Sequence, residues 1–430
     1  MATTGRGARR FRGGLAATAA GLLIIASLPA QAADTADPPA KVADYRSQNF
    51  WVHTDLSAGE AQELLERLET MLGLVSNYFG QPLRNAPIEC YVVKDLANWP
   101  GDSIPSADGR RQIAANAGVT ITQGGRQGNQ VLFKSVVYAI ADRGTPQHEA
   151  VHAYCGQTFG TTGPVWYSEG MAELGQYWRE GEKAVQCHPA VVEYIHDSPP
   201  KSLNEIVNGQ EITGDSWQNY AWRWALCHLL ANHPEYQKDF HLLGSSILAG
   251  GPLTFERVFG QKAEAISFEY LFFLRHFDLG YRVDLCQWDL NAKATLLRGK
   301  GTKTPKIEAG LGWQPTRIAV LADKEYEFSS TGDWQTAEDA ERVTADGGDE
   351  GLGRLVGVIL SDSPTEGEPP VLSEPFDLGS YGTFTAPAGG RLYLRCRDGW
   401  GQLADNEGAI KVKIKLHGQG KPLPMPKPAE

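Results

Sequence analysis

The sequence predicts a chain of two units: a mixed α+β unit that is mostly helical, followed by an all-β sandwich. Three observations support this fold class. The chain has 430 residues, more than the roughly 250–300 at which a single core stops growing. Helical periodicity runs from Thr145 to about residue 280. After Leu297 the pattern changes to short strands broken by Gly and Pro, which is typical of a sandwich.

Composition excludes several classes of protein. With 42% hydrophobic and 21% charged residues, the chain is too ordinary in composition to be disordered. Its 40 Lys+Arg against 51 Asp+Glu give a formal net charge of −11. This charge argues against nucleic acid as a partner, because phosphates need a basic surface.

The amino terminus predicts a signal peptide at residues 1–32. Four arginines precede an apolar run from Leu15 to Leu28, and Ala30-Gln31-Ala32 follows as a cleavage site. The run is shorter than the ~20 residues of a spanning helix, so cleavage is favoured over anchoring. We therefore expect a secreted or periplasmic protein with no membrane span after cleavage. Without the signal, 36 basic residues face 51 acidic ones, a net charge of −15.

The next elements follow from local patterns. Residues 33–45, rich in Ala, Asp and Pro, are expected to form a flexible leader, and residues 49–53 a strand. Ser57 and Glu60 form a capping box that opens a helix. Residues 88–93 and 131–140 are predicted strands, and the polar, Gly-rich stretch 101–128 a loop. The apolar face of the helix consists of Leu64, Leu65, Leu68, Met71, Leu72, Val75 and Phe79.

Two questions stay open in this part of the chain. The strand 131–140 is either a sheet edge on which an extended peptide pairs or an ordinary sheet strand. The six cysteines permit disulfides in an exported chain, but their pairing cannot be read from the sequence. Cys227 lies in an apolar helical run and is equally consistent with a buried thiol.

A metal-binding motif begins at His148. His148-Glu149-Ala150-Val151-His152 is an H-E-x-x-H sequence. On a helix, residues i and i+4 share one face, so both imidazoles can reach one metal ion, and Glu149 projects toward a metal-bound water. Sixteen residues separate His152 from Glu169, which lies in a second predicted helix. Its carboxylate can complete a His2Glu site that leaves a fourth position open, as catalytic zinc requires.

The two motifs together resemble the gluzincin clan of zinc metallopeptidases, the thermolysin- and aminopeptidase-like enzymes. The matching residues are H-E-A-V-H at 148–152 and W-Y-S-E-G-M-A-E at 166–173. The resemblance implies a zincin-like domain over residues 46–298, with His148, His152 and Glu169 as zinc ligands. It also implies that Glu149 is the general base that activates a zinc-bound water.

Two further roles are less determined by the sequence. In similar enzymes an acid at the position of Glu173 bonds a ligand imidazole, although a solvated helix carboxylate is the alternative. The oxyanion of peptide hydrolysis needs a donor besides the metal. Tyr220 is the first candidate, with Tyr167 and His228 as rivals and a buried structural tyrosine as the alternative.

Residues 310–417, after a predicted linker at 299–309, resemble a calcium-dependent galactophilic bacterial lectin with a jelly-roll-like sandwich. The resemblance rests on G-W-Q-P-T at 312–316, P-F-D-L-G at 375–379, F-T-A-P at 384–387 and G-R-L-Y-L at 390–394. It implies a calcium loop in which four side chains supply oxygen ligands. A sandwich that only stabilises or docks the first unit is the alternative, and residues 418–430 are expected to be disordered. The four implied ligands are Asp398, Gln402, Asp405 and Asn406.

These inferences predict an exported zinc peptidase that hydrolyses peptide bonds, with an accessory sandwich for calcium and a carbohydrate or glycoprotein. A catalytically silent, peptidase-like module that binds carbohydrate or protein is the competing class. The presence of Glu149 disfavours that class, because a protein that has lost catalytic activity has no chemical reason to keep a general base between two metal ligands. A purely structural zinc is the third alternative, but an open position beside a glutamate suits catalysis better.

Overall fold

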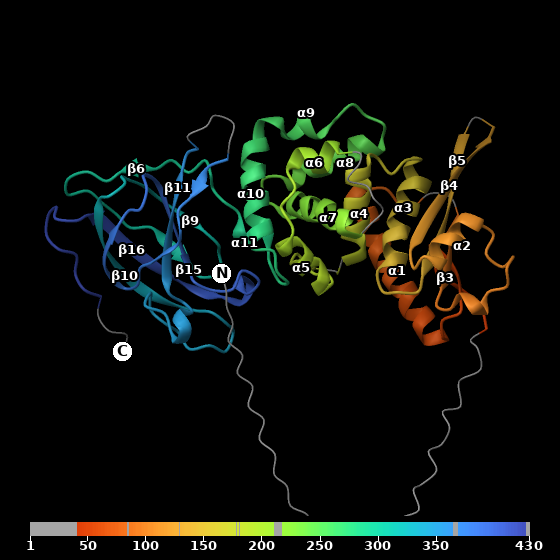
Figure 1. Cartoon of the computed structure of the whole chain (residues 1–430), viewed down its shortest axis with the longest axis horizontal. Helices are drawn as coiled ribbons and strands as arrows, with labels where there is room; N and C mark the ends of the chain where they lie inside the picture. Colours follow the sequence, from red (N-terminus) through yellow and green to blue (C-terminus); the bar gives the residue numbers. More distant parts are fainter. Residues whose placement is uncertain are drawn as a thin grey trace, which may run out of the picture. The chain divides into compact units, whose positions relative to one another are not determined.

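The computed structural model describes residues 41–83, 86–128, 130–177, 179, 181–209, 217–363 and 369–426. The predicted signal peptide and most of the predicted leader lie outside these residues. The described chain is α+β, with one mixed sheet and its helices followed by two antiparallel-rich sheets (Figure 1). This confirms the predicted fold class at the coarse level.

A five-stranded mixed sheet opens the first unit. It contains β1 (Ala43–Arg46), β2 (Phe50–Thr54), β3 (Ile88–Val93), β4 (Gly118–Gln127) and β5 (Gln130–Ile140), in the order β1-β2-β3-β5-β4. The central pairs β2–β3 and β3–β5 are parallel, and the outer pairs are antiparallel. The end of the expected leader is therefore structured, because Ala43 to Arg46 pair with β2.

Helix α1 (Ala58–Phe79) forms as its sequence pattern predicts. Ser57 and Glu60 make both halves of the capping box, and Gly80 ends the helix with a φ of 63°, a conformation that favours glycine. All seven residues of the predicted apolar face are buried in the main core. The helix packs against α3.

The predicted loop at 101–128 is wrong. The segment contains helix α2 (Ala107–Ala114) and strand β4, which forms a long hairpin with β5 (Figure 1). Val119 and Ile121 pack on the cluster that includes Ile113 of α2. Since β5 pairs with both β3 and β4, it is an inner strand, and β4 is the edge.

The remaining helices of the first unit share one large core with the sheet. The pairs α3–α4 and α4–α7 are in close contact, and α7 is buried without a break from Ala221 to Leu230. The helices are α3 (Thr145–Phe159), α4 (Val165–Tyr177), α5 (Pro189–Asp197), α6 (Leu203–Asn208), α7 (Trp217–Asn232), α8 (Gln237–Leu248), α9 (Phe255–Phe259), α10 (Ala263–Arg275) and α11 (Val283–Cys286).

Two sheets of the second unit enclose one core. One has the order β14-β10-β16-β7, with β8 also on β16, and the other the order β12-β11-β15-β9-β6, with β13 on β11. The strands are β6 (Thr295–Leu296), β7 (Thr302–Lys303), β8 (Lys306–Glu308), β9 (Gln314–Val320), β10 (Glu325–Gln335), β11 (Leu355–Ser361), β12 (Val371–Leu372), β13 (Phe376–Asp377), β14 (Tyr381–Thr385), β15 (Gly390–Cys396) and β16 (Glu407–Leu416).

Both ends of this unit differ from expectation. The segment 299–309, expected as a linker, supplies β7 and β8 to the sheet by pairing with β16. The beginning of the tail, expected to be disordered, packs on the same sheet: Leu423 is buried, and the Ser329 hydroxyl donates to the Pro424 carbonyl at 2.7 Å. The edge of β16 that does not pair with β10 leaves main-chain N–H and C=O groups free. The segment 299–309 forms strands because it pairs with these groups.

Two further expectations can be compared with the described residues. All six cysteines lie within them, and none forms a disulfide; five, including Cys227, are buried. Across the described ranges, none of the helices combines the length and the apolarity that crossing a membrane would need.

Candidate metal centre

Helix α3 presents the H-E-x-x-H residues at a well-defined helix start. Asp142 accepts hydrogen bonds from the backbone N–H of Gly144 at 3.0 Å and of Thr145 at 2.6 Å, and from the Thr145 hydroxyl at 2.8 Å. Pro146 lies in the first turn, where its missing N–H costs nothing. At the other end, Gly160 stops the helix with a φ of 79°. His148 and His152 are thereby held one turn apart on one face.

Three potential ligand atoms converge between α3 and α4. The distance from His148 Nε2 to His152 Nε2 is 3.2 Å, and Glu169 Oε2 lies 3.3 Å and 3.4 Å from these two nitrogens. Zinc bonds of about 2.0–2.1 Å at tetrahedral angles place ligand atoms about 3.3–3.4 Å apart. The three atoms therefore fit a zinc ion, and the donor set is of the kind that zinc selects.

Each imidazole is oriented by a contact at its other nitrogen. Glu173 Oε1 lies 3.1 Å from His148 Nδ1, as predicted for this residue, and both side chains are buried. Ser168 Oγ lies 3.2 Å from His152 Nδ1. Ser168 was not among the predicted site residues, because a serine before a glutamate carries no signal of its own. Such contacts fix the ring orientation that a metal ligand needs.

The ionisation of this group follows from the same contacts. Burial alone would lower the pKa of His148, but hydrogen bonds to Glu169 and Glu173 raise it well above its usual value. Burial alone would raise the pKa of Glu169, but bonds to His148 and His152 hold it well below its usual value. A partly buried carboxylate facing two imidazoles thus favours positive charge between them, which a divalent cation satisfies.

Glu149 lies next to this group and is held from the edge strand. The Thr120 hydroxyl lies 2.8 Å from Glu149 Oε2 and 2.8 Å from the Glu149 carbonyl oxygen. Strand β4 approaches α3 closely here: a Cβ on Gly118 would lie 2.7 Å from Glu149 Cγ and 2.7 Å from Thr145 Cγ2. Thr120 was also missed, because its segment was expected to be a loop.

An open cleft of about 800 Å³ exposes the group to solvent. Its walls come from β4, α3, α4 and α7, and Glu149 and Tyr220 are among the lining residues. The ring of Tyr220 lies 5.7 Å from that of His148, centroid to centroid. Its rivals are elsewhere: Tyr167 is buried against Phe240, and His228 lines a different pocket. Of the three candidates, only Tyr220 is at the metal group; its role stays a prediction.

The predicted calcium loop lies between β15 and β16. Asp398 Oδ2 and Asn406 Oδ1 are both buried and have no hydrogen-bond donor. Burial raises the pKa of Asp398, although hydrogen bonds and Arg395 oppose this. Gln402 and Asp405 are exposed. Asp398 and Asn406 thus each offer a buried acceptor oxygen, whereas the other two implied ligands offer no comparable buried oxygen.

The same loop also contacts the first unit. The ring of Trp400 lies 5.1 Å from that of Phe272 and 4.6 Å from that of His276, both at the end of α10. A Cβ on Gly401 would lie 2.1 Å from the Leu279 carbonyl oxygen. This agrees with the docking alternative for the sandwich.

Comparison with known proteins gives little. No model of a known protein family matches the chain, and no curated protein is similar in sequence. A solved structure described as "EclA N-terminal domain; PllA-like lectin" is similar at 20% identity and a TM-score of 0.22, covering 27% of this chain and 96% of that one. A functionally unknown conserved protein from Bacillus anthracis strain Ames is similar at 16% identity and a TM-score of 0.16, covering 29% of this chain and 23% of that one. TM-scores this low establish neither a fold nor a function for this chain.

Proposed function

We propose that the protein is a zinc-dependent peptidase of the gluzincin type, with a zincin-like first unit. The observation that carries this proposal is the triangle of His148 Nε2, His152 Nε2 and Glu169 Oε2, with sides of 3.2–3.4 Å, beside the carboxylate of Glu149. Among the described residues, the side chains that could hold a metal ion at this place are three: His148, His152 and Glu169. Three ligands in an open cleft suit a catalytic site, whereas structural zinc sites are closed by four.

The chemistry divides between the ion and the chain. When bound, zinc supplies Lewis acidity for the peptide carbonyl and for the attacking water. Glu149 accepts the proton of that water and delivers it to the leaving amine nitrogen. Thr120 fixes the direction of the Glu149 carboxylate, while Glu173 and Ser168 fix the two imidazoles. Tyr220 supplies the hydroxyl for the developing oxyanion.

The first test separates metal binding from turnover. Glu149→Gln is expected to keep one zinc per chain but to lose peptide hydrolysis, because the amide cannot accept a proton. The measurements are metal content by mass spectrometry and cleavage of a peptide library with and without chelator. Glu193→Gln, at an exposed carboxylate of α5, is the matched control and should behave like the wild type.

Other outcomes would contradict this proposal. Unchanged hydrolysis by Glu149→Gln would remove Glu149 from the mechanism. A wild-type protein without zinc, or a His152→Ala variant with full zinc, would exclude the metal site. Zinc at full occupancy without cleavage of any peptide would favour the silent binding module.

A second candidate function concerns the second unit, for which we propose a jelly-roll-like sandwich with a calcium site at Asp398 and Asn406. Their two buried oxygens without donors support it. Calcium binding should raise the melting temperature of the wild-type chain, and Asn406→Leu should abolish that increase. A melting temperature independent of calcium would leave the unit as a docking domain. Carbohydrate binding would require the loop to be accessible beside Trp400.

A further inference from the structure

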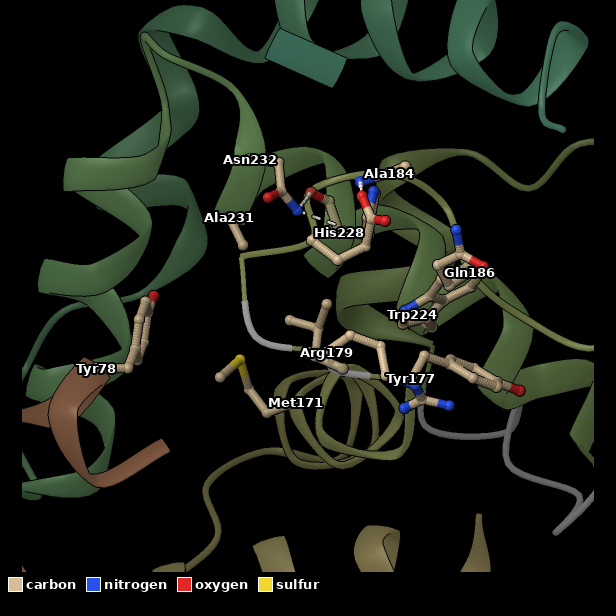
Figure 2. Close-up of a pocket in the computed structure, with 12 residues that line it drawn as sticks. Tyr78, Met171, Tyr177, Arg179, Ala184, Gln186, Trp224, His228, Ala231 and Asn232 are labelled. Atoms are coloured by element: carbon tan, nitrogen blue, oxygen red, sulfur yellow. Dashed lines mark hydrogen bonds between the residues drawn. The ribbon is translucent and has the colours of Figure 1, made fainter. Parts of the chain in front are cut away.

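Helix α4 has one side that contacts the metal centre and another that borders a pocket. Glu169 and Glu173 lie about one turn apart on the side that contacts His148 of α3. With about 3.6 residues per turn, Met171 and Leu174 lie on the side away from Glu169. They line a pocket of about 120 Å³ between α4 and α7 (Figure 2). Packing on that side therefore fixes the position of α4 only in part, and contacts with α3 complete it.

Gln147 of α3 makes such a contact with the last turn of α4. Its side-chain amide nitrogen donates to the Gly175 carbonyl at 3.3 Å, and its side-chain oxygen accepts from the Arg67 guanidinium of α1 at 3.2 Å. Carbonyl groups in the last turn of a helix have no partner within that helix, so Gly175 needs one from outside. Gln147 is 2% exposed, and a bond shielded from water in this way is costly to lose.

The two helices approach each other closely at this hydrogen bond. A Cβ on Gly175 would lie 2.3 Å from Val151 Cγ2, so glycine lets the backbone of α4 come within reach of Gln147. Gln147 directly precedes His148, and Gly175 follows Glu173 by two residues. The bond therefore joins the two backbone segments whose side chains meet where His148 Nδ1 lies 3.1 Å from Glu173 Oε1.

We infer that Gln147 is a positioning residue of the metal centre, which holds α4 at the distance from α3 at which Glu173 orients the ring of His148. This role rests on the proposed function, because it concerns the zinc ion that His148 binds there. Arg67 supports it from α1, since a donor at the side-chain oxygen turns the N–H groups of Gln147 toward α4. Without this bond zinc binding should weaken, because the partner at the second nitrogen of a histidine fixes the ring and makes it a better ligand.

Gln147→Met tests this role, because methionine has a similar length and can make neither hydrogen bond. Zinc affinity of the full chain is measured by competition with a chelator, and ligand geometry by the visible spectrum of cobalt(II) bound in place of zinc. Loss of a direct partner of a metal ligand weakens binding about 10- to 100-fold, so a residue one step further away should cost about three- to tenfold, with a changed cobalt spectrum. Gln147→Asn keeps the amide but is too short to reach Gly175. It should change both measurements in the same direction even if Gln147→Met fails to fold.

Gln157→Met is the matched control. Gln157 is also a glutamine of α3 with 2% exposure, but its side chain bonds the Ser135 N–H at 3.1 Å and the Ala86 carbonyl at 2.6 Å, on the side of the sheet. This variant should unfold at a lower urea concentration, as Gln147→Met does, but keep the zinc affinity and cobalt spectrum of the wild type.

The outcomes separate this role from the metal site itself. Wild-type zinc affinity in Gln147→Met, or equal weakening in Gln157→Met, would overturn the positioning role and leave the metal site in place. A wild-type chain that binds no zinc would contradict the proposed function and the positioning role together.

Discussion

At the scale of single residues, the site depends on side chains that touch the ligands and the base. The carboxylate of Glu149 can act as a base only if it points into the cleft, and its direction is set by one hydroxyl, that of Thr120. This contact crosses from the edge strand β4 to helix α3. The orientation of the base is therefore a property of β4 as much as of α3.

Thr120→Val tests this contact. Valine keeps the shape of threonine and removes the hydroxyl, so Glu149 should lose its orientation while the proposed ligands on α3 and α4 stay in place. We expect kcat to fall about tenfold or more, with KM and zinc content little changed. Thr122→Val is the control: Thr122 lies on the same strand but bonds Ser135 at 2.8 Å. A larger fall for Thr122→Val would show that the strand, and not the contact, is responsible.

At the scale of elements, α4 and α7 pack at the closest distance that their side chains allow. Gly170, next to Glu169, faces α7: a Cβ there would lie 2.3 Å from Cys227 Sγ and 2.9 Å from the Arg223 carbonyl oxygen. Glycine is thus required because backbone atoms on α7 cannot yield as a flexible side chain would. The position of Glu169 relative to α3 depends on this packing.

Gly170→Ala should therefore destabilise the protein by about 1–3 kcal/mol through overpacking, and it should lower zinc affinity because Glu169 moves with α4. Gly73→Ala is the matched control. Gly73 also lies in a helix, α1, but a Cβ added there would meet nothing within 4 Å, so alanine should stabilise by about 0.5–1 kcal/mol. Urea unfolding and zinc titration measure both effects. Equal free energies of unfolding for the two variants would contradict the packing argument.

Sequence patterns predicted some helices and strands correctly and missed others. Helix α1 was predicted with its start and its buried face, because a capping box and a 3.6-residue apolar period are both local. His148, Glu149 and His152 were predicted because residues i and i+4 share one face of a helix. Glu169 and Glu173 were predicted from the resemblance of the second motif to that of the gluzincins. Strand β4 was missed: its second half, Gln123–Gln127, is polar and Gly-rich, and only pairing with β5 makes it a strand. Thr120 was therefore not predicted as a site residue either, because its contact with Glu149, 29 residues further along the chain, leaves no local sequence pattern.

At the scale of the whole molecule, aromatic residues join the two units. Phe268 and Phe272 of α10 share a core cluster with Trp288, Trp313 and Tyr393, and the Tyr393 hydroxyl donates to the Asp289 carbonyl at 2.7 Å. Arg395 is buried beside this cluster, with its guanidinium 3.7 Å from the centroid of Trp400. The loop that resembles a calcium site is thus also part of the junction. We therefore expect the stability of this loop to be coupled to that of the first unit.

His276 makes this junction sensitive to pH. Burial first, and then the charges of Arg395, Arg275 and His196, lower its pKa to about 4 from the usual 6.5. Between pH 4 and pH 6.5, His276 is therefore protonated in the unfolded chain but neutral in the folded chain. The contribution of His276 to the free energy of unfolding is therefore fully present above about pH 6.5. It decreases as the pH drops toward 4, by at most about 1.4 kcal/mol per pH unit for one proton. Below about pH 4, His276 is protonated in the folded protein as well, so the free energy of unfolding loses nothing more through this residue.

His276→Phe isolates this effect, because phenylalanine keeps an aromatic ring against Trp400 but cannot be protonated. The free energy of unfolding, measured in urea from about pH 4 to about pH 8, should fall less steeply with acidity in the variant than in the wild type. The two curves should run parallel above about pH 6.5 and diverge below it. Other groups that titrate, His228 included, remain in both proteins and cancel in the difference. Curves that stay parallel down to pH 4 would show that His276 accepts its proton freely in the folded protein, and that the junction does not exclude it.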